Sequence, residues 1–425
     1  MRLVCIECGR TYSAAENRYA CDCGDMLEIV HDYGAMDGEK LKRLFDKRLS
    51  ERMTLHSGGV WRYKELIAPV LPEPFVTTKY EGNTGLYETE ALNRYAGVRS
   101  CRFKAQSENP SGSFKDNGMT VAVSYGRSLG YDRFVCSSTG NTSSSLAMYA
   151  ALAGMTSLVL MPDRNISLNK VLQTLAYGAR VVSFPGTYDD GIAFLKQSAE
   201  ELGLYVCNSI NPWRIEGQKS IVYETAQNMG WTLPDWIVVP GGALSNATAL
   251  GKGLRDLFTL GLIDKLPRVA IVQADGASPF HRMIELGGRN FVPDPAPYTR
   301  ATAMNIGNPP SWRKALRGTV EYTNGVTVSV SDEDIFNAKA LIDRSGIGCE
   351  PASAATLAGL RKLTALKIVD SDETAVCILT GNVLKDTDAI RDYHLGDSAE
   401  AAYPNRIRQT GLSERELRGL LEEHL

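Results

Sequence analysis

One lysine of this chain stands in a setting that suits amine chemistry. Lys115 lies in the run E-N-P-S-G-S-F-K-D-N-G-M at 108–119, which is rich in turn residues and leads into a helical pattern. We expect Lys115 near the N-terminus of that helix, where the positive end of the helix dipole disfavours an ammonium group. A lysine whose pKa is lowered can form a Schiff base with a carbonyl compound. An exposed lysine on a surface helix is the alternative that this stretch alone leaves open.

Two further runs each combine a strand-like segment, a turn and a helix-like segment. The run at 136–154 carries a series of Ser, Thr and Asn residues where its helix should begin. Such hydroxyl and backbone N–H groups at a helix N-terminus favour binding of an anion. The run at 238–253 has Gly241 and Gly242 at its turn, where consecutive backbone amides could bind a phosphate. A dinucleotide-binding loop is the alternative for this second run, although it contains no G-x-G-x-x-G.

Four cysteines in the first 23 residues have a spacing that is typical of a metal site. Cys5 and Cys8 form C-x-x-C, Cys21 and Cys23 form C-x-C, and a glycine follows each pair. Four thiolates suit a tetrahedral Zn²⁺ ion and leave no open coordination position, so the predicted site is structural. The second pair is one residue shorter than the usual C-x-x-C, and a set of free thiols is the alternative.

Composition and charge limit the class of protein that holds these residues. The length of 425 residues suggests two large domains and a small module. The residues are 44% hydrophobic, as in globular proteins, and the net charge is -3. No apolar run approaches the ~18 residues of a membrane span, and the N-terminus lacks the apolar core of a signal peptide. No basic stripe marks nucleic-acid binding. Nine cysteines in such a chain do not suit a disulfide framework. We therefore expect a cytoplasmic protein that binds neither membranes nor nucleic acid.

After Pro72 and Pro74 the sequence alternates short apolar segments with amphipathic ones. The apolar segments predict strands at 133–136, 157–161, 180–184, 236–240, 268–273 and 374–379. The amphipathic segments predict helices at 116–130, 141–154, 166–178, 188–204 and 246–260. Before this region we expect a charged helical arm at 40–63 that is anchored by Trp61 and Tyr63. We also expect a C-terminal helix at 413–425. This alternation indicates an α/β fold with mostly parallel sheets. Ligands of such sheets bind at the carboxyl ends of the strands, where the three runs described above should meet.

Several motifs, taken together, resemble those of one enzyme family. They are S-G-S-F-K-D at 111–116, S-T-G-N-T at 138–142, N-S-I-N-P-W-R-I-E-G-Q-K at 208–219, E-P-A-S-A-A at 350–355 and L-T-G-N-V-L-K-D at 379–386. In these motifs and their order, nearly the whole chain is similar to the threonine synthases, which are pyridoxal-phosphate enzymes of the tryptophan-synthase β-like fold, fold type II. The Cys-bearing N-terminus and E-G-N-T at 81–84 are also similar to those of many prokaryotic members.

The resemblance implies a domain organisation. We expect two doubly wound α/β domains with pyridoxal 5'-phosphate in the cleft between them, and a small N-terminal Cys-rich ribbon. The expected divisions are 1–30 for the ribbon, 31–95 for an N-terminal arm and the start of the large domain, 96–230 for the smaller domain and 231–425 for the large cofactor-binding domain. We also expect strand exchange between the two large units, and a homodimer.

The resemblance also implies a role for individual residues. Lys115 corresponds to the lysine that forms the Schiff base with the cofactor, Asn141 to the partner of the pyridoxal 3′-hydroxyl, and Thr380 to the partner of the ring nitrogen. The loop for the cofactor phosphate is expected to comprise Gly241, Gly242, Leu244, Ser245 and Asn246. The residues for the substrate α-carboxylate are expected to be Ser138, Thr139 and Thr142. The residues for the substrate phosphate are expected to be Asn208, Ser209 and Arg214.

The implied reaction converts O-phospho-L-homoserine and water to L-threonine and phosphate, by γ-elimination and then addition of water at Cβ. Two positions depart from the family pattern: Ala243 replaces the usual amide side chain, and Asn305 stands where relatives tend to carry Arg or Gln. One alternative is therefore a related β-replacement or elimination enzyme that acts on another phosphorylated amino acid, such as O-phosphoserine. A catalytically silent homologue that binds the cofactor is a third possibility. Arg214 could also be a structural ion-pair partner of Glu216 or Glu224.

Overall fold

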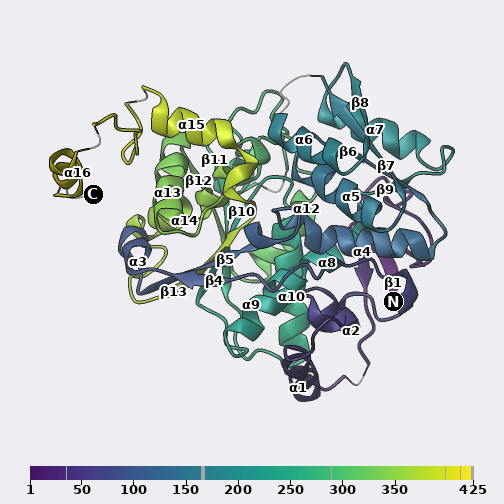
Figure 1. The fold of residues 1–425 in the computed structure, drawn as a ribbon. Coiled ribbons are helices and arrows are strands. Elements are labelled where there is room, and N and C mark those ends of the chain that lie inside the picture. The colour runs from purple at the N-terminus through teal and green to yellow at the C-terminus, as the bar shows by residue number, and fades with distance from the viewer. Residues whose placement is uncertain (35, 164–167, 289, 398, 412, 423–425) are drawn as a thin grey trace.

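Three β-sheets organise the chain in the computed structural model, which describes residues 1–34, 36–163, 168–288, 290–397, 399–411 and 413–422 (Figure 1). The N-terminal sheet is antiparallel, and its order is β2 (Thr11–Ser13), β1 (Arg2–Cys5), β3 (Leu27–Val30). The largest sheet has the order β12 (Val326–Val330), β11 (Arg268–Ala274), β10 (Trp236–Pro240), β13 (Thr374–Leu379), β5 (Ser100–Ala105), β4 (Leu86–Glu88). The third sheet has the order β8 (Arg180–Phe184), β7 (Thr156–Pro162), β6 (Arg133–Ser137), β9 (Tyr205–Val206).

Neighbouring strands of the two larger sheets are parallel except for β4, which runs antiparallel to β5. The predicted α/β class with mostly parallel sheets is therefore confirmed. Strand β5 falls within residues 96–230, yet it pairs with β13 in the six-stranded sheet. The domain boundaries stay a prediction.

Alternate side chains of the six-stranded sheet enter two separate cores. On β10, Ile237 and Val239 pack in one cluster, whereas Trp236 and Val238 pack in the other. Helix α10 (Ser245–Thr259) contributes to the first cluster, and α13 (Asp332–Arg344) and α14 (Pro351–Ala365) contribute to the second. A strand that is buried on both faces has no polar side, which is why these strands read as continuous apolar runs.

The four-stranded sheet is covered in the same way. Phe134 and Cys136 of β6 pack with α4 (Lys115–Ser128) and α5 (Asn141–Leu152), whereas Val135 packs with Leu195 of α7 (Tyr188–Ser198) on the other face. Helix α6 (Leu168–Ala176) packs against α5. Both larger sheets are therefore doubly wound, and Figure 1 shows them side by side, with the N-terminal sheet near the four-stranded one.

The remaining helices connect these layers. They are α1 (Gly38–Arg48), α2 (Lys64–Ile67), α3 (Glu90–Ala96), α8 (Pro212–Gln218), α9 (Ser220–Asn228), α11 (Pro279–Glu285), α12 (Trp312–Ala315), α15 (Thr387–Leu395) and α16 (Glu414–Glu422). Single helical turns of the 3-10 type lie at Leu55–Ser57, Trp61–Tyr63, Glu73–Phe75, Gln106–Glu108, Thr302–Met304 and Val383–Lys385, and a π-helical segment lies at Leu316–Glu321.

The predicted strands are all found, three of them with unchanged bounds at 180–184, 236–240 and 374–379. The predicted helices are also found, but the one at 188–204 ends earlier, at Ser198. Residues 166–167 and 423–425 of two predicted helices lie outside the described residues. The prediction of a helical arm over 40–63 is wrong beyond Arg48, where only two single turns follow α1.

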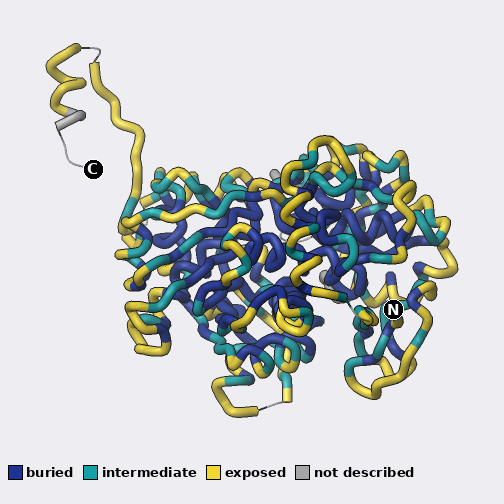
Figure 2. Tube along the Cα trace, turned by 90° about the horizontal axis from the view of Figure 1, so that it is seen from below, coloured by how far each residue is buried: buried dark blue, intermediate teal, exposed yellow. Residues whose placement is uncertain are grey.

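Two aromatic residues anchor this arm, as predicted. The indole N–H of Trp61 donates to Thr120 Oγ1 at 2.8 Å, and the Tyr63 hydroxyl donates to Gln227 Oε1 at 2.5 Å. Both aromatic side chains are fully buried. At the other end of the chain, Figure 2 shows the C-terminal segment with α16 extending away from the body, and the described residues from 404 to 419 are exposed. Among the described residues, none of the helices has the length and apolar character needed to cross a membrane.

Candidate active site

Lys115 is the first residue of α4, as predicted, and its amine faces the Phe114 ring at 4.0 Å from the ring centre. Burial is the largest cause that lowers the pKa of this amine, to about 7. The positive charge of Arg214 also lowers this pKa, and the carboxylate of Glu350 raises it. The sequence predicted that the helix dipole would lower the pKa of Lys115, whereas in the structure desolvation and a neighbouring cation lower it. At neutral pH an amine with this pKa is partly unprotonated, and the unprotonated form is the nucleophile.

The loop before Lys115 is fastened to the loop that follows β13. The amide of Phe114 donates to Thr380 O at 2.9 Å, and the amide of Asn382 donates to Gly112 O at 2.9 Å. Gly112 has a φ of +83°, which a residue with a side chain rarely adopts. These backbone contacts place Lys115 next to Thr380, although the two are far apart in sequence.

Asp116 ties the same loop to α5. Its buried carboxylate accepts hydrogen bonds of 2.6 Å from the Ser111 amide, the Ser111 hydroxyl and the Ser145 hydroxyl. Burial raises the pKa of Asp116, and these three donors oppose that rise. Ser111 therefore bonds to Asp116 and does not cap the helix, and the Ser113 hydroxyl is buried without a hydrogen-bond partner among the described residues.

Glu350 joins two of the predicted residues and was missed as a site residue. The Asn141 amide donates to both carboxylate oxygens of Glu350, at 3.1 and 3.0 Å, and the Thr380 hydroxyl donates to one of them at 3.4 Å. Thr380 also lies 2.9 Å from the Ser353 hydroxyl. A Cβ on Gly381 would stand 2.3 Å from the Glu350 carboxylate, so only glycine leaves room for it. The sequence feature that could have indicated Glu350 is its place directly before a proline that begins a helix.

The turn between β10 and α10 contains two glycines that pack tightly against neighbouring residues. A Cβ on Gly241 would lie 2.7 Å from Ile271 Cγ2, and one on Gly242 would lie 3.0 Å from Ala303 O. Leu244 takes a left-handed conformation with a φ of 63°, which is uncommon for a residue with a side chain. Ser245 and Asn246 begin α10 and are buried.

Asn246 has an unusual environment. Both its amide oxygen and its amide nitrogen are buried without a hydrogen-bond partner within the described residues. The same holds for the Asn141 amide oxygen. Buried polar atoms are nearly always paired in folded proteins, so these atoms indicate positions where a polar ligand would bind.

Two of the predicted substrate-phosphate residues, Asn208 and Ser209, lie between β9 and α8, and Arg214 lies on α8. The Asn208 side chain pairs with the backbone of Ser137, accepting from its amide at 3.0 Å and donating to its carbonyl at 2.8 Å. The Ser209 hydroxyl is buried without a partner in the described part of the chain. Arg214 is 1% exposed and donates from Nη1 to Cys207 O at 3.1 Å.

Two glycines bring Arg214 close to Lys115. A Cβ on Gly118 of α4 would lie 2.7 Å from Arg214 O, and one on Gly217 of α8 would lie 2.0 Å from Asn117 O. Helices α4 and α8 therefore cross with backbone against backbone, which only glycine allows at these two positions. The carboxylates that the sequence offered as partners of Arg214 bind lysines: Lys219 and Lys252 contact Glu216, and Lys104 contacts Glu224.

The predicted carboxylate residues lie where α5 begins. Ser138, Thr139 and Thr142 are half-buried there, and the Ser138 hydroxyl accepts from the Gly140 amide at 3.1 Å. The two departures from the family pattern lie on touching loops, because Gly242 lies against Ala303 O. The Asn305 amide oxygen is buried without a partner among the described residues.

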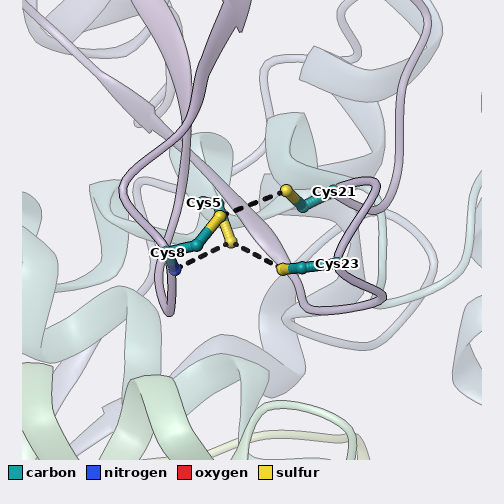
Figure 3. Close-up of side chains that lie close together, drawn as sticks. All are labelled: Cys5, Cys8, Cys21 and Cys23. Carbon is teal, nitrogen blue, oxygen red and sulfur yellow. Dashed lines mark hydrogen bonds between the residues drawn. The ribbon is translucent and has the colours of Figure 1, made fainter.

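The four N-terminal cysteines form a separate cluster, shown in Figure 3. Their sulfur atoms lie within 4.8 Å of one another, with Cys5 and Cys23 separated by 3.5 Å and Cys8 and Cys21 by 3.6 Å. Hydrogen bonds from the Cys23 amide and from the Tyr12 hydroxyl lower the pKa of Cys21 to about 6. This favours the thiolate form of Cys21, which is the form that binds metal ions. The Asp25 amide lowers the pKa of Cys23, but contacts with the neighbouring thiols of Cys21 and Cys5 raise it to about 12.

Comparison of the sequence with known proteins identifies a family. Residues 77–381 match the family described as pyridoxal-phosphate dependent enzyme. A threonine synthase of Methanocaldococcus jannaschii is 42% identical over 386 residues, covering 91% of this chain and 93% of that protein. A threonine synthase of Methanosarcina acetivorans is also 42% identical, over 92% of this chain and 93% of that protein. A chloroplastic threonine synthase of Arabidopsis thaliana is 34% identical over 92% of this chain and 78% of that protein.

Solved structures of other enzymes have the same fold. A diaminopropionate ammonia lyase from Escherichia coli superposes with a TM-score of 0.64 over 91% of this chain and 97% of that one, at 16% identity. Maize serine racemase superposes with a TM-score of 0.61 over 76% of this chain and 93% of that one, at 18% identity. At these identities the likeness concerns the fold alone.

Proposed function

Because this chain belongs to the pyridoxal-phosphate dependent enzymes and, within them, to the threonine synthases, we propose that it converts O-phospho-L-homoserine and water to L-threonine and phosphate. It is a pyridoxal-phosphate dependent lyase. The observation that carries the proposal for this substrate is the pairing of a lysine amine of pKa about 7 with the buried cation of Arg214 across the α4–α8 crossing. One group suits amine chemistry on the cofactor, and the other suits a phosphate.

The residues present fit pyridoxal phosphate. The amine of Lys115 suits its aldehyde, and the glycine turn at 241–242 with the unpartnered amide of Asn246 suits its phosphate. The unpartnered Asn141 oxygen and the Thr380 hydroxyl suit the two polar positions of its ring. When bound, the cofactor supplies an electron sink that stabilises carbanions of the amino-acid substrate. Gly241, Gly242, Leu244, Ser245 and Asn246 would hold its phosphate.

Lys115 is the proposed proton carrier. Its pKa near 7 lets the amine accept a proton at one step and return it at another without a large energetic cost at neutral pH. The positive charge of Arg214 favours the neutral amine. The two hydrogen bonds that the Asn141 amide nitrogen donates to the Glu350 carboxylate hold this amide in one orientation. Glu350 is therefore a proposed positioning residue.

Substrate binding is proposed at both ends of the amino acid. The hydroxyls of Ser138, Thr139 and Thr142 at the start of α5 suit the α-carboxylate, because hydroxyl and amide donors at a helix N-terminus bind anions. Asn208, Ser209 and Arg214 suit the phosphate. A planar guanidinium can donate to two phosphate oxygens at once. Since Arg214 is buried, its charge is poorly screened by water, which strengthens its attraction for a phosphate.

The second candidate is β-elimination or β-replacement on a shorter phosphorylated amino acid such as O-phosphoserine. It is favoured by Ala243 and Asn305, since Ala243 offers no side-chain donor and Asn305 carries no charge. The same cofactor residues would serve both reactions.

We further propose that the cysteine cluster holds one structural Zn²⁺ ion. Four sulfur atoms within 4.8 Å of one another, on a three-stranded ribbon, suit a closed tetrahedral site. We also propose the domain divisions stated above and a homodimer on the strength of the family resemblance, and a cytoplasmic location on the strength of the composition.

A panel of phosphorylated amino acids tests the proposed function. The purified holoenzyme is incubated with O-phosphohomoserine, O-phosphoserine and O-phosphothreonine, and both inorganic phosphate and amino-acid products are measured. We expect phosphate and threonine in equal amounts from O-phosphohomoserine. Phosphate release from O-phosphoserine with none from O-phosphohomoserine would establish the second candidate instead.

A further inference from the structure

The segment that carries the proposed substrate-phosphate residues is held from behind by the N-terminal ribbon. We call residues 206–216 the phosphate segment and residues 1–30 the ribbon, and we count His31, which directly follows the ribbon, together with it. The ribbon contacts this segment, or its direct neighbours, at three places. None of these contacts involves Asn208, Ser209 or Arg214 themselves, so they are separate from the proposed substrate contacts.

The first contact is made by His31, which directly follows β3 of the ribbon. His31 Nε2 lies 2.6 Å from Glu216 Oε2, and the two side chains are 2% and 0% exposed. Glu216 stands two positions after Arg214 on α8, about 200° around the helix axis. Helix α8 therefore presents Arg214 on one side and Glu216 on the other. His31 fixes the rear side of the helix whose front side carries the guanidinium.

The second contact is made by Tyr19. Its hydroxyl accepts a hydrogen bond of 2.9 Å from the amide of Val206, two residues before Asn208. The Tyr19 ring also meets the Tyr205 ring edge to face, with the ring centres 6.2 Å apart. Strand β9 comprises only Tyr205 and Val206, so Tyr19 contacts both of its residues.

The third contact runs through Tyr125 of α4. The Tyr125 hydroxyl donates to Ala14 O of the ribbon. The Tyr125 ring stacks on Trp213, with ring centres 3.6 Å apart. Trp213 directly precedes Arg214. The ribbon thus reaches both helices that meet at the Lys115–Arg214 pair.

The cysteine cluster holds together the parts of the ribbon that make these contacts. Cys5 ends β1 and pairs with Leu27 at the start of β3, and β3 leads to His31. Tyr19 lies between the two cysteine pairs in sequence. Lys252 bonds to Ile29 O and also to Glu216, which adds a further link between β3 and α8.

We propose that the ribbon positions the phosphate segment, with Tyr19 and His31 as positioning residues for the group that binds the substrate phosphate. This inference rests on the proposed role of Asn208, Ser209 and Arg214. Loosening either contact lets Arg214 and Asn208 sample positions that are less suited to the phosphate. Binding of the phosphate group then weakens, while the cofactor residues at the start of α10 and directly after β13 are unaffected.

Three variants test the proposal in the full-length holoenzyme. Tyr19→Phe removes only the hydroxyl that accepts from Val206. His31→Leu removes the donor to Glu216, and His31→Gln restores an N–H group of similar reach. We expect Tyr19→Phe and His31→Leu each to raise KM for O-phosphohomoserine by about threefold to tenfold, the range for loss of one hydrogen bond. We expect kcat to change less than twofold, the cofactor absorption spectrum to stay unchanged, and His31→Gln to recover most of the wild-type KM.

The matched control is Arg317→Gln. Arg317 donates to Ile6 O and pairs with Glu7, so this variant loosens the ribbon at a site away from the phosphate segment. We expect wild-type KM and kcat. Unchanged KM in both Tyr19→Phe and His31→Leu would overturn the proposal, as would an equal rise of KM in Arg317→Gln. If His31→Leu does not fold, Tyr19→Phe decides the question alone.

A second measurement separates this proposal from the proposed function. The dissociation constant of inorganic phosphate is measured by calorimetry on the wild type and on each variant. We expect weaker phosphate binding in Tyr19→Phe and His31→Leu. If the wild type does not act on O-phosphohomoserine, the proposed function fails, and phosphate affinity still tests the ribbon. Equal phosphate affinity in wild type and variants, or no phosphate binding at all, would overturn the inference.

Discussion

Replacing Arg214 with glutamine tests the phosphate site with the least change in volume. Arg214 is buried, so its guanidinium meets a phosphate with little screening by water. Charge-assisted hydrogen bonds contribute about 1.5–3 kcal/mol each, and a guanidinium can make two to one phosphate. Their loss totals several kcal/mol, and about 1.4 kcal/mol corresponds to a factor of ten. We therefore expect kcat/KM for O-phosphohomoserine to fall by at least ~10²-fold in Arg214→Gln.

The same variant has a second readout in the apoenzyme. The charge of Arg214 lowers the pKa of Lys115, so its removal raises that pKa above about 7 and leaves less neutral amine at neutral pH. Reconstitution with pyridoxal phosphate requires the neutral amine, so its rate at pH 7 should fall and its pH midpoint should move upward.

Arg313→Gln is the matched control, since Arg313 is a partly exposed arginine that pairs with Asp25 of the ribbon. We expect wild-type kcat/KM and an unchanged reconstitution profile. Restoring an amide with Ala243→Asn should partly recover activity in Arg214→Gln. A kcat/KM within threefold of wild type in Arg214→Gln would refute the assignment of Arg214 to the phosphate.

Three further predictions follow from the site and from the cysteine cluster. Lys115→Ala should lose all turnover, and borohydride should no longer fix the cofactor to the protein; fixation on another lysine would refute the assignment. Glu350→Gln removes the negative charge that raises the pKa of Lys115, so this pKa should fall below about 7 and the midpoint of apoenzyme reconstitution should move to lower pH; an upward shift would contradict the structure. Elemental analysis should find one zinc per chain in the wild type and little in Cys8→Ser, whereas a metal-free wild type with four titratable thiols would show that the cluster is not a metal site.

The sequence predicts those parts of the fold in which burial leaves a simple pattern. Strands buried on both faces, such as Trp236–Pro240 and Thr374–Leu379, appear as continuous apolar runs and were found with unchanged bounds. Strand Ser100–Ala105 was missed because it includes Lys104, a charged residue that the fold buries. Lys104 is stabilised there by Glu224, which is distant in sequence, so no local pattern could reveal it. The arm after Arg48 was overextended because the charged helical pattern before it was continued across Ser57, Gly58 and Gly59, which are turn signals.

The candidate site, like the fold, could be predicted from the sequence only in part. The turns before Asn141 and at Gly241 are recognisable because Ser, Thr, Gly and Asn follow apolar strands, and the turn before Lys115 is recognisable from its own Pro, Gly and Ser residues. The direction of the Lys115 pKa shift could also be predicted, but its main cause is burial, which only the fold reveals. The contacts of Glu350 arise from residues on other elements, so sequence spacing could not assign it to the site.

The most direct test of the proposed reaction follows the oxygen atoms. The holoenzyme is given O-phosphohomoserine in water labelled with heavy oxygen, and the products are analysed by mass spectrometry. Elimination of phosphate followed by addition of water predicts one labelled oxygen in the threonine hydroxyl and none in the released phosphate. Labelled phosphate with unlabelled homoserine would mean simple hydrolysis of the phosphate ester, and it would contradict the account.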